Sequence, residues 1–135
     1  MNFKFREGLI RIPVTIVYEG NQITIDKCIL DTGSATTAID IDFVNFNYKK
    51  PAKIRRLCGI GGGTQEVISQ QTDKFIINGV EFDNIEIEFG RIKTDFGIHG
   101  FIGNDILSRF ILNINYRTFK IDLILQKLNK KNMLH

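Results

Sequence analysis

The most informative stretch of the sequence reads Cys28-Ile29-Leu30-Asp31-Thr32-Gly33-Ser34-Ala35-Thr36-Thr37-Ala38-Ile39. An apolar strand leads to a carboxylate, a tight Thr-Gly-Ser turn follows, and a second apolar strand leaves the turn. Gly33 lets the backbone fold back, so that its amide can approach the carboxylate of Asp31. The hydroxyl groups of Thr32 and Ser34 are short donors that can fix the orientation of this carboxylate. Taken alone, the pattern also fits an aspartate that only satisfies the amides of a turn.

The rest of the chain has the alternation of β-strands. Apolar side chains occupy every second position, with few exceptions, in the segments 10–18, 85–89 and 119–125. The polar positions between them, including Glu86 and Glu88, are expected on a solvent face. Turn residues separate such segments, and Asn78-Gly79 between two apolar runs predicts a two-residue hairpin.

Helical patterning is scarce. The sequence predicts one short helix over 104–110, capped by Asn104 or Asp105, and at most a turn of helix near 41–47. Many strands in few residues indicate a mostly β protein, either a small closed antiparallel β-barrel or a sandwich, with one short C-terminal helix. We expect residues 1–135 to form a single domain.

Composition and charge exclude several classes of protein. The 135 residues are 43% hydrophobic and 24% charged, which excludes a disordered, a collagen-like or a disulfide-stapled chain. The net charge is +3, from 18 basic and 15 acidic residues, and three lysines lie in a basic tail from about residue 127. A basic tail on a neutral body gives no reason to expect a nucleic-acid partner.

The sequence shows no apolar run that could span a membrane and no secretory signal, so we expect a cytoplasmic protein without a membrane partner. Its two cysteines, Cys28 and Cys58, are expected to be small buried hydrophobes. Together with His99 and His135 they fit no familiar zinc spacing, so we expect no metal.

Two further segments accompany the Asp31 motif in order along the chain. A glycine-rich segment, 57–64, lies between two strand-like stretches, and two apolar residues and a glycine, Phe101-Ile102-Gly103, precede the short helix. In this order and spacing the three segments resemble the retropepsin-like aspartic proteases, the single-domain, retroviral-type branch of the pepsin clan. The resemblance extends from about Leu9 to Leu125, nearly the whole chain.

The resemblance implies a role for each matching residue. Asp31 matches the catalytic aspartate, Thr32 and Gly33 complete its triplet, and Ser34 would take part in hydrogen bonding at the active site. The tip of a flap that closes over substrate would be formed by Ile60, Gly61, Gly62 and Gly63. This chemistry uses no cofactor.

The chain departs from the family pattern at two places. Many retroviral enzymes carry further aspartates after the triplet and an arginine in the helix that pairs with one of them. The corresponding positions here read Ala35-Thr36-Thr37 and Asn104-Asp105, so that ion pair is missing. The departure leaves the chemistry intact but puts the usual dimer contacts in question.

One aspartate per chain implies two chains. Peptide hydrolysis of this kind needs two close carboxylates that share a proton, one to activate water and one to protonate the scissile carbonyl. Because the sequence contains one Asp-[Ser/Thr]-Gly motif, we expect a C2 homodimer that cleaves polypeptide substrates, with segments 2–5 and 119–125 at the interface. A hydroxyl of Ser34 donating to Asp31 would lower the pKa of the dyad and extend activity into acid.

Other interpretations remain open. The same fold could serve as a non-catalytic dimeric peptide-binding or protein-binding module. Asp40-Ile41-Asp42-Phe43-Val44 fits the nucleophile signature of haloacid-dehalogenase-like phosphatases, although these need alternating helices and strands. The glycines of 59–63 could suggest a phosphate loop, but no Gly-Lys-[Ser/Thr] follows. Arg55 and Arg56 either favour acidic substrate residues or belong to an exposed strand surface.

Overall fold

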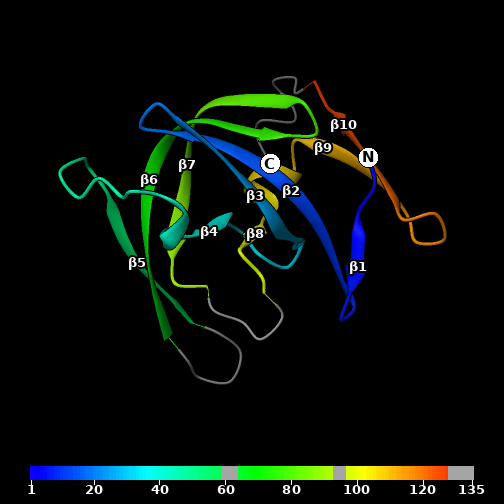
Figure 1. Cartoon of the computed structure of the whole chain (residues 1–135), viewed down its shortest axis with the longest axis horizontal. Coiled ribbons are helices and arrows are strands. Elements are labelled where there is room, and N and C mark those ends of the chain that lie inside the picture. The colour runs from blue at the N-terminus through cyan, green and yellow to red at the C-terminus, as the bar shows by residue number, and fades with distance from the viewer. Residues whose placement is uncertain (59–63, 93–96, 128–135) are drawn as a thin grey trace.

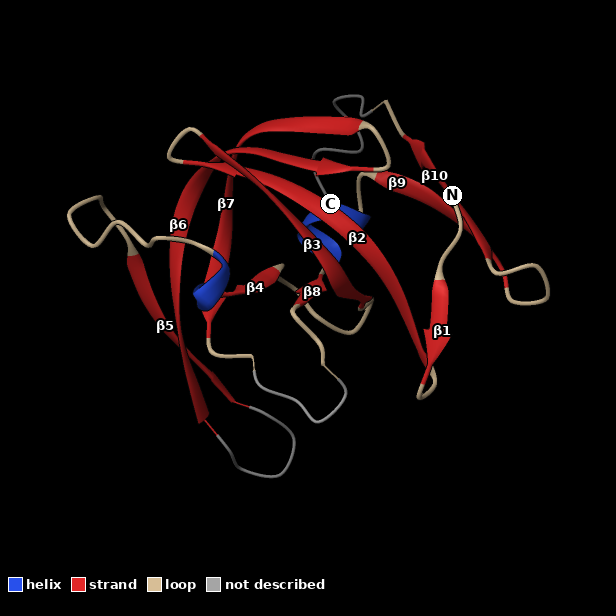
Figure 2. Cartoon of the chain, viewed as in Figure 1, coloured by secondary structure: helices blue, strands red, loops and turns tan. Residues whose placement is uncertain are grey.

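The computed structural model describes residues 1–58, 64–92 and 97–127 and is mostly β, as predicted (Figure 1, Figure 2). Its elements in chain order are β1 (Lys4–Arg6), β2 (Leu9–Tyr18), β3 (Asn21–Leu30), β4 (Ala38–Asp40), the 3-10 helix η1 (Ile41–Phe43), β5 (Lys53–Cys58), β6 (Thr64–Ile77), β7 (Val80–Gly90), β8 (Gly100–Ile102), α1 (Asn104–Leu107), β9 (Phe110–Asn115) and β10 (Lys120–Leu125). None of the helical segments in the described ranges is long and apolar enough to cross a membrane.

Eight strands form one sheet in the order β1-β2-β3-β8-β4-β7-β6-β5, and β2 also pairs with β6. The pairings β2–β3, β3–β8, β8–β4, β4–β7, β7–β6 and β6–β2 therefore return to the strand at which they began. In Figure 1 the short strands β4 and β8 lie between the long strands of this circuit. Strands β9 and β10 form a separate two-stranded sheet.

Most of the pairings are antiparallel, as expected, but two are parallel and were not predicted. β3 runs parallel to β8, and β4 runs parallel to β7. Parallel neighbours need a long connection between them, and here each pair joins segments that are far apart in the sequence. Both parallel pairs flank the segment that carries Asp31, so this segment is held by strands from the second half of the chain.

Two hairpins have the turn chemistry typical of two-residue loops, and one of them was predicted. Asn78 and Gly79 have φ angles of 49° and 76°, and Glu19 and Gly20 have 49° and 76° as well. Two successive residues with positive φ are the requirement of a type I′ turn, whose twist matches that of the flanking strands. The hairpin predicted at Asn78-Gly79 is confirmed.

The core follows the alternation of the sequence. All of the apolar residues at alternate positions of β2 are buried, namely Ile10, Ile12, Val14, Ile16 and Tyr18. Ile121 and Leu123 of β10 are buried too, but Phe119 and Leu125 are 47% and 51% exposed, which differs from the prediction. Cys28 is fully buried, and burial raises the pKa of its thiol to about 12, so it is a small protonated core residue as expected.

The helical segments are shorter than predicted, and their caps differ. Helix α1 ends at Leu107 because β9 begins at Phe110, and its N-cap is Gly103 without a side-chain hydrogen bond. The predicted caps, Asn104 and Asp105, make other contacts. At η1, the buried Asp40 accepts a hydrogen bond from the amide of Asp42 at 3.0 Å. Asp40 thus caps η1. This structural role explains an aspartate at position 40 without a phosphatase nucleophile.

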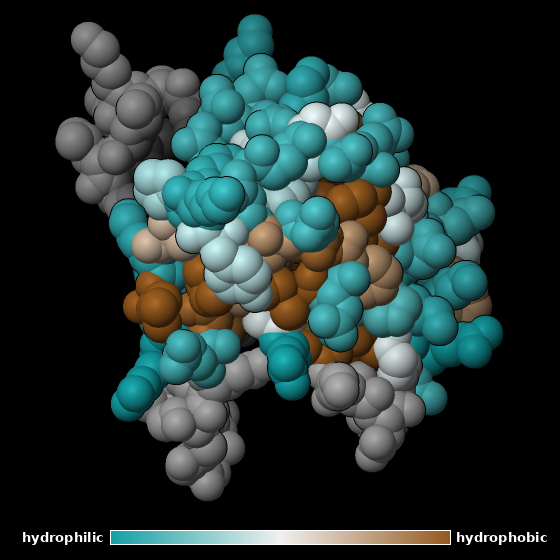
Figure 3. All heavy atoms as spheres, turned by 60° about the vertical axis from the view of Figure 1, so that its left-hand side comes forward, coloured by the Kyte–Doolittle hydropathy of each residue, from teal (hydrophilic) through white to brown (hydrophobic). Residues whose placement is uncertain are grey.

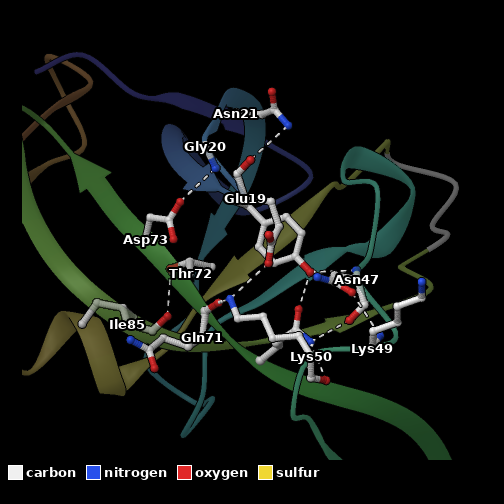
Figure 4. Close-up of polar contacts among 12 residues, drawn as sticks. Glu19, Gly20, Asn21, Asn47, Lys49, Lys50, Gln71, Thr72, Asp73 and Ile85 are labelled. Carbon is white, nitrogen blue, oxygen red and sulfur yellow. Dashed lines mark hydrogen bonds and ion pairs between the residues drawn. The ribbon is translucent and has the colours of Figure 1, made fainter.

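A polar network anchors the chain where it approaches β5 (Figure 4). Lys50 Nζ donates to the carbonyl oxygen of Gln71 at 3.0 Å and forms an ion pair with Glu19 at 3.3 Å. The side chain of Gln70 donates to the carbonyl oxygens of Asn47 and Lys50 at 3.0 and 3.2 Å. These bonds fasten the segment before β5 to β6 and to the β2–β3 turn. They hold β5 and β6 together at the end of their pairing that lies away from residues 59–63.

Candidate active site

Asp31 directly follows β3 and is held by backbone contacts. Its amide donates to the carbonyl oxygen of Ile102 in β8 at 2.9 Å, and its carbonyl oxygen accepts from the amide of Ser34 at 3.2 Å. The amide of Gly33 donates to Asp31 Oδ1 at 3.0 Å, as the sequence predicted. A Cβ at Gly33 would lie 3.3 Å from the same oxygen, so glycine gives the carboxylate both a donor and the space it needs.

The hydroxyl of Ser34 has a different partner from the predicted one. Ser34 Oγ donates to the carbonyl oxygen of Thr36 at 2.8 Å. A hydroxyl has a single proton to donate, so in this structure Ser34 does not donate to Asp31, and the hydrogen bond predicted between them is not formed. Ser34 still lines the same cavity as Asp31.

Helix α1 holds the loop that follows Asp31. The side chain of Asn104 donates to the carbonyl oxygen of Thr32 at 2.7 Å, and its backbone amide donates to the carbonyl oxygen of Ser34 at 2.8 Å. The amide of Asp105 donates to the carbonyl oxygen of Ala35 at 3.2 Å. The residues that replace the family's ion pair therefore support the loop by hydrogen bonds to its backbone.

Thr37 is the second link between the loop and the helix, and sequence reasoning missed it. Its side chain is fully buried, and its hydroxyl donates to Asp105 Oδ1 at 2.6 Å while accepting from the amide of Gly103 at 3.0 Å. The amide of Thr37 donates to Asp105 Oδ2 at 3.0 Å. The only indication of this link in the sequence was that the residues at positions 104 and 105 differ from those of the family pattern.

We expect Thr37→Val to lower the free energy of unfolding by about 2 kcal/mol, because the variant keeps the shape but removes the donor to Asp105 Oδ1 and leaves the buried amide of Gly103 without its acceptor. Thr24→Val is the matched control, since the hydroxyl of Thr24 is exposed and bonds only to that of Thr15. We expect the control to change stability by about 0.5 kcal/mol or less. Urea denaturation of the three proteins measures both values, and equal stabilities would contradict this role of Thr37.

Asp31 borders a cavity of about 150 Å³ that several strands form together. Six of its lining residues are Asp31, Ser34, Ala38, Val67, Glu88 and Phe101. Gly90 lines this cavity and also a neighbouring hollow of about 680 Å³ between the η1 region and β6. A further hollow of about 760 Å³ lies beside the N-terminal segment and does not include Asp31. The cavity at Asp31 is smaller than either hollow, and at Gly90 it adjoins the hollow of about 680 Å³.

The surface near this region is mixed in polarity. On the side that Figure 3 brings forward, apolar surface gathers in the middle of the face and polar surface borders it. Within the ranges that the structure describes, no group of three or more His, Cys, Asp or Glu side chains could hold a metal ion.

The predicted flap residues Ile60, Gly61, Gly62 and Gly63 lie outside the described residues. The strands on either side of them are described, and β5 pairs antiparallel with β6 from Lys53↔Ser69 to Cys58↔Thr64. The segment 59–63 thus connects two adjacent strands, as a flap tip would.

The N-terminal residues pair with the start of β10. Asn2 forms a β-bridge with Lys120, and the amide of Phe3 donates to the carbonyl oxygen of Phe119 at 2.9 Å. The N-terminal amine donates to the carbonyl oxygen of Ile121 at 3.0 Å. The predicted interface segments are therefore neighbours within one chain. Around them several apolar side chains are exposed, namely Phe5, Ile111, Tyr116, Phe119, Ile124 and Leu125.

Comparison with solved structures identifies the fold. The crystal structure of a retropepsin-like aspartic protease from Rickettsia conorii matches with a TM-score of 0.63 and 21% identity over 91% of this chain and 88% of that one. The retroviral protease-like domain of Ddi1 from Leishmania major matches with a TM-score of 0.52 and 16% identity over 96% and 97%. No family model and no curated protein matches the sequence. The chain has a retropepsin-like fold, which confirms the resemblance seen in the sequence.

Proposed function

We propose that this chain is an aspartic endopeptidase that works as a C2 homodimer. The observation that carries the proposal is the position of Asp31 after β3, with Oδ1 bonded to the amide of Gly33 and the side chain at the edge of a cavity. Asp31, Thr32 and Gly33 are its catalytic triplet. The retropepsin-like fold supports this assignment, because the solved structure from Rickettsia conorii that shares it is that of a retropepsin-like aspartic protease.

The proposed mechanism uses one Asp31 from each chain. Two carboxylates near a two-fold axis share one proton, since both cannot be ionised at so short a distance. The ionised one takes a proton from a water molecule, and the protonated one donates to the oxygen of the scissile carbonyl. Hydration of the carbonyl carbon then gives a tetrahedral intermediate, which collapses to a carboxylic acid and an amine.

The dimer is also supported by what the chain exposes. Thr32, Gly33 and Ala35 are exposed on the Asp31 loop, so a partner's loop can approach them. The exposed apolar residues around segments 2–5 and 119–125 would be covered in the same dimer. We further propose that the strand circuit is the small closed barrel of this fold, and that residues 1–135 are one domain with a basic tail from about residue 127.

The substrate would bind as an extended polypeptide across the cavity and the adjoining hollow. Extended peptides bind such sites by backbone hydrogen bonds, and side-chain pockets then set the sequence preference. Ile60, Gly61, Gly62 and Gly63 would close over the peptide from the β5–β6 side.

Cleavage of a mixed peptide library, read by mass spectrometry from about pH 4 to 7.5, tests the proposal. We expect cuts by the wild-type protein that Asp31→Asn does not make. A wild-type protein that makes no cuts, even at tenfold higher concentration where a weak dimer would assemble, would contradict the proposed activity and favour the non-catalytic binding module.

A further inference from the structure

The cavity at Asp31 contains a second carboxylate, that of Glu88 in β7. The sequence alternation predicted Glu88 on a solvent face, but the residue is only 2% exposed. Both of its carboxylate oxygens are buried, and neither has a hydrogen-bond partner among the described residues. Arg55 in β5 forms a long ion pair with it, with Nη1 3.8 Å from Glu88 Oε1, too far for a hydrogen bond.

A buried carboxylate without hydrogen bonds is costly, because it has lost the hydrogen bonds of its hydration shell and a long ion pair does not replace them. Buried polar groups in folded proteins are nearly always bonded, so an exception calls for an explanation. At the edge of a substrate cavity the natural explanation is a donor that the substrate brings. From this we propose that Glu88 determines specificity, by selecting substrates that place a lysine or arginine side chain in the Asp31 cavity. The inference deepens the proposed function and rests on it.

The other walls of the cavity fit such a side chain. Val67, Ile92, Phe101 and Ala38 are apolar, and they line the same space as Glu88. A lysine or arginine has an apolar stem and a charged end, so its stem would pack against these walls while its cation reaches the carboxylate. The volume of about 150 Å³ is below the roughly 300 Å³ of whole-ligand pockets, which fits a subsite for one side chain.

The position of Glu88 relative to Asp31 is fixed by the backbone. Its amide donates to the carbonyl oxygen of Thr37 at 2.9 Å, and the parallel β4–β7 pairing places Ala38 beside Glu88. Thr37 belongs to the loop that α1 holds behind Asp31. The carboxylate therefore belongs to a subsite close to the scissile bond rather than to a remote surface.

Without substrate, Arg55 supplies the positive charge that faces the carboxylate of Glu88. Its side chain is half exposed, with a relative accessibility of 50%, whereas that of Glu88 is 3%. A substrate cation that bonds directly to Glu88 would make a shorter, charge-assisted contact, and Arg55 can turn toward solvent. The rival explanation is a permanent structural ion pair between Arg55 and Glu88, in which case Glu88 would have no effect on substrate choice.

The test compares peptides that differ at one position near the scissile bond, which carries lysine, arginine, norleucine or glutamate. For wild-type protein we expect kcat/KM for lysine or arginine to exceed that for norleucine by about 10- to 100-fold at one position, the effect of one charge-assisted hydrogen bond. In Glu88→Gln this ratio should fall to about 3 or less. The matched control is Glu86→Gln, an exposed glutamate on the same strand, which should keep the wild-type ratio.

A second measurement needs no cleavage. The inactive Asp31→Asn protein should bind a fluorescent lysine peptide about tenfold or more tightly than its norleucine analogue, and Asp31→Asn/Glu88→Gln should lose this difference. Equal binding of the two peptides by Asp31→Asn overturns the role of Glu88, as does a wild-type enzyme with no basic preference or a Glu88→Gln enzyme that retains it. Absence of all cleavage by wild-type protein would instead overturn the proposed activity, while the binding comparison still decides the role of Glu88.

Discussion

Replacing Asp31 by asparagine is expected to lower kcat/KM for peptide cleavage by about 10³-fold or more, because the variant dimer has no carboxylate to activate water or to hold the shared proton. The fold should be unaffected. Asparagine keeps an oxygen at the position of Oδ1 that can accept from the amide of Gly33, now 3.0 Å away. Replacing two close carboxylates, which resist being ionised together, by two neutral amides should, if anything, stabilise the dimer. Initial rates on one cleaved peptide, with thermal denaturation alongside, measure both effects.

Asp26→Asn is the control for this variant. Asp26 is an exposed aspartate on β3, the strand that leads to Asp31, so the substitution makes the same chemical change away from the cavity. We expect wild-type rates from it. A protein in which Asp31→Asn and Asp26→Asn cleave at the same rate would show that the cuts come from another enzyme or another residue.

Gly103→Ala is expected to lower the free energy of unfolding by about 3 kcal/mol or more, through overpacking rather than through backbone conformation. The φ angle of Gly103 is −97°, which alanine adopts without strain. A Cβ at this position would, however, lie 2.3 Å from the carbonyl oxygen of Thr36 and 2.9 Å from that of Ser34. Those atoms are backbone of the Asp31 loop, so the loop and α1 must separate.

Chemical denaturation and cleavage rates together measure the effect of Gly103→Ala. We expect cleavage to fall with stability, since the hydrogen bonds that Asn104 and the amide of Asp105 donate to the loop depend on this close approach. The control is Ser108→Ala, an exposed position at the other end of the helix, with an expected change of about 0.5 kcal/mol or less. A Gly103→Ala protein as stable as the control would refute the tight contact between helix and loop.

Much of the fold could be predicted from the sequence, because one-faced strands have a period of two. The buried residues of β2 and the hairpin at Asn78-Gly79 follow directly from that pattern. The parallel pairs β3–β8 and β4–β7 could not be predicted, since each joins segments far apart in the chain and no local pattern records the partner. Alternation also does not say how far burial extends along a strand, which is why Phe119 and Leu125, at opposite ends of the segment, are exposed while Ile121 and Leu123 between them are buried.

The contacts of the candidate site likewise divide into those that could be predicted from the sequence and those that could not. The Asp31 motif and the amide of Gly33 could be predicted because their contacts are local in sequence. Ser34 was assigned the wrong acceptor, since the nearer carbonyl of Thr36 competes for its single proton. Glu88 was expected in solvent because alternation assumes one covered face, whereas four successive residues at the end of β7, 87–90, are all buried.

Subunit mixing tests most directly whether each active site takes one aspartate from each of two chains. Wild-type and Asp31→Asn chains are refolded together at constant total concentration, and cleavage is measured against the wild-type fraction. If only dimers of two wild-type chains are active, the rate follows the square of that fraction and falls to about one quarter at equal amounts. A linear dependence, with about half the rate at equal amounts, would mean that a single chain carries a complete active site and would contradict the account.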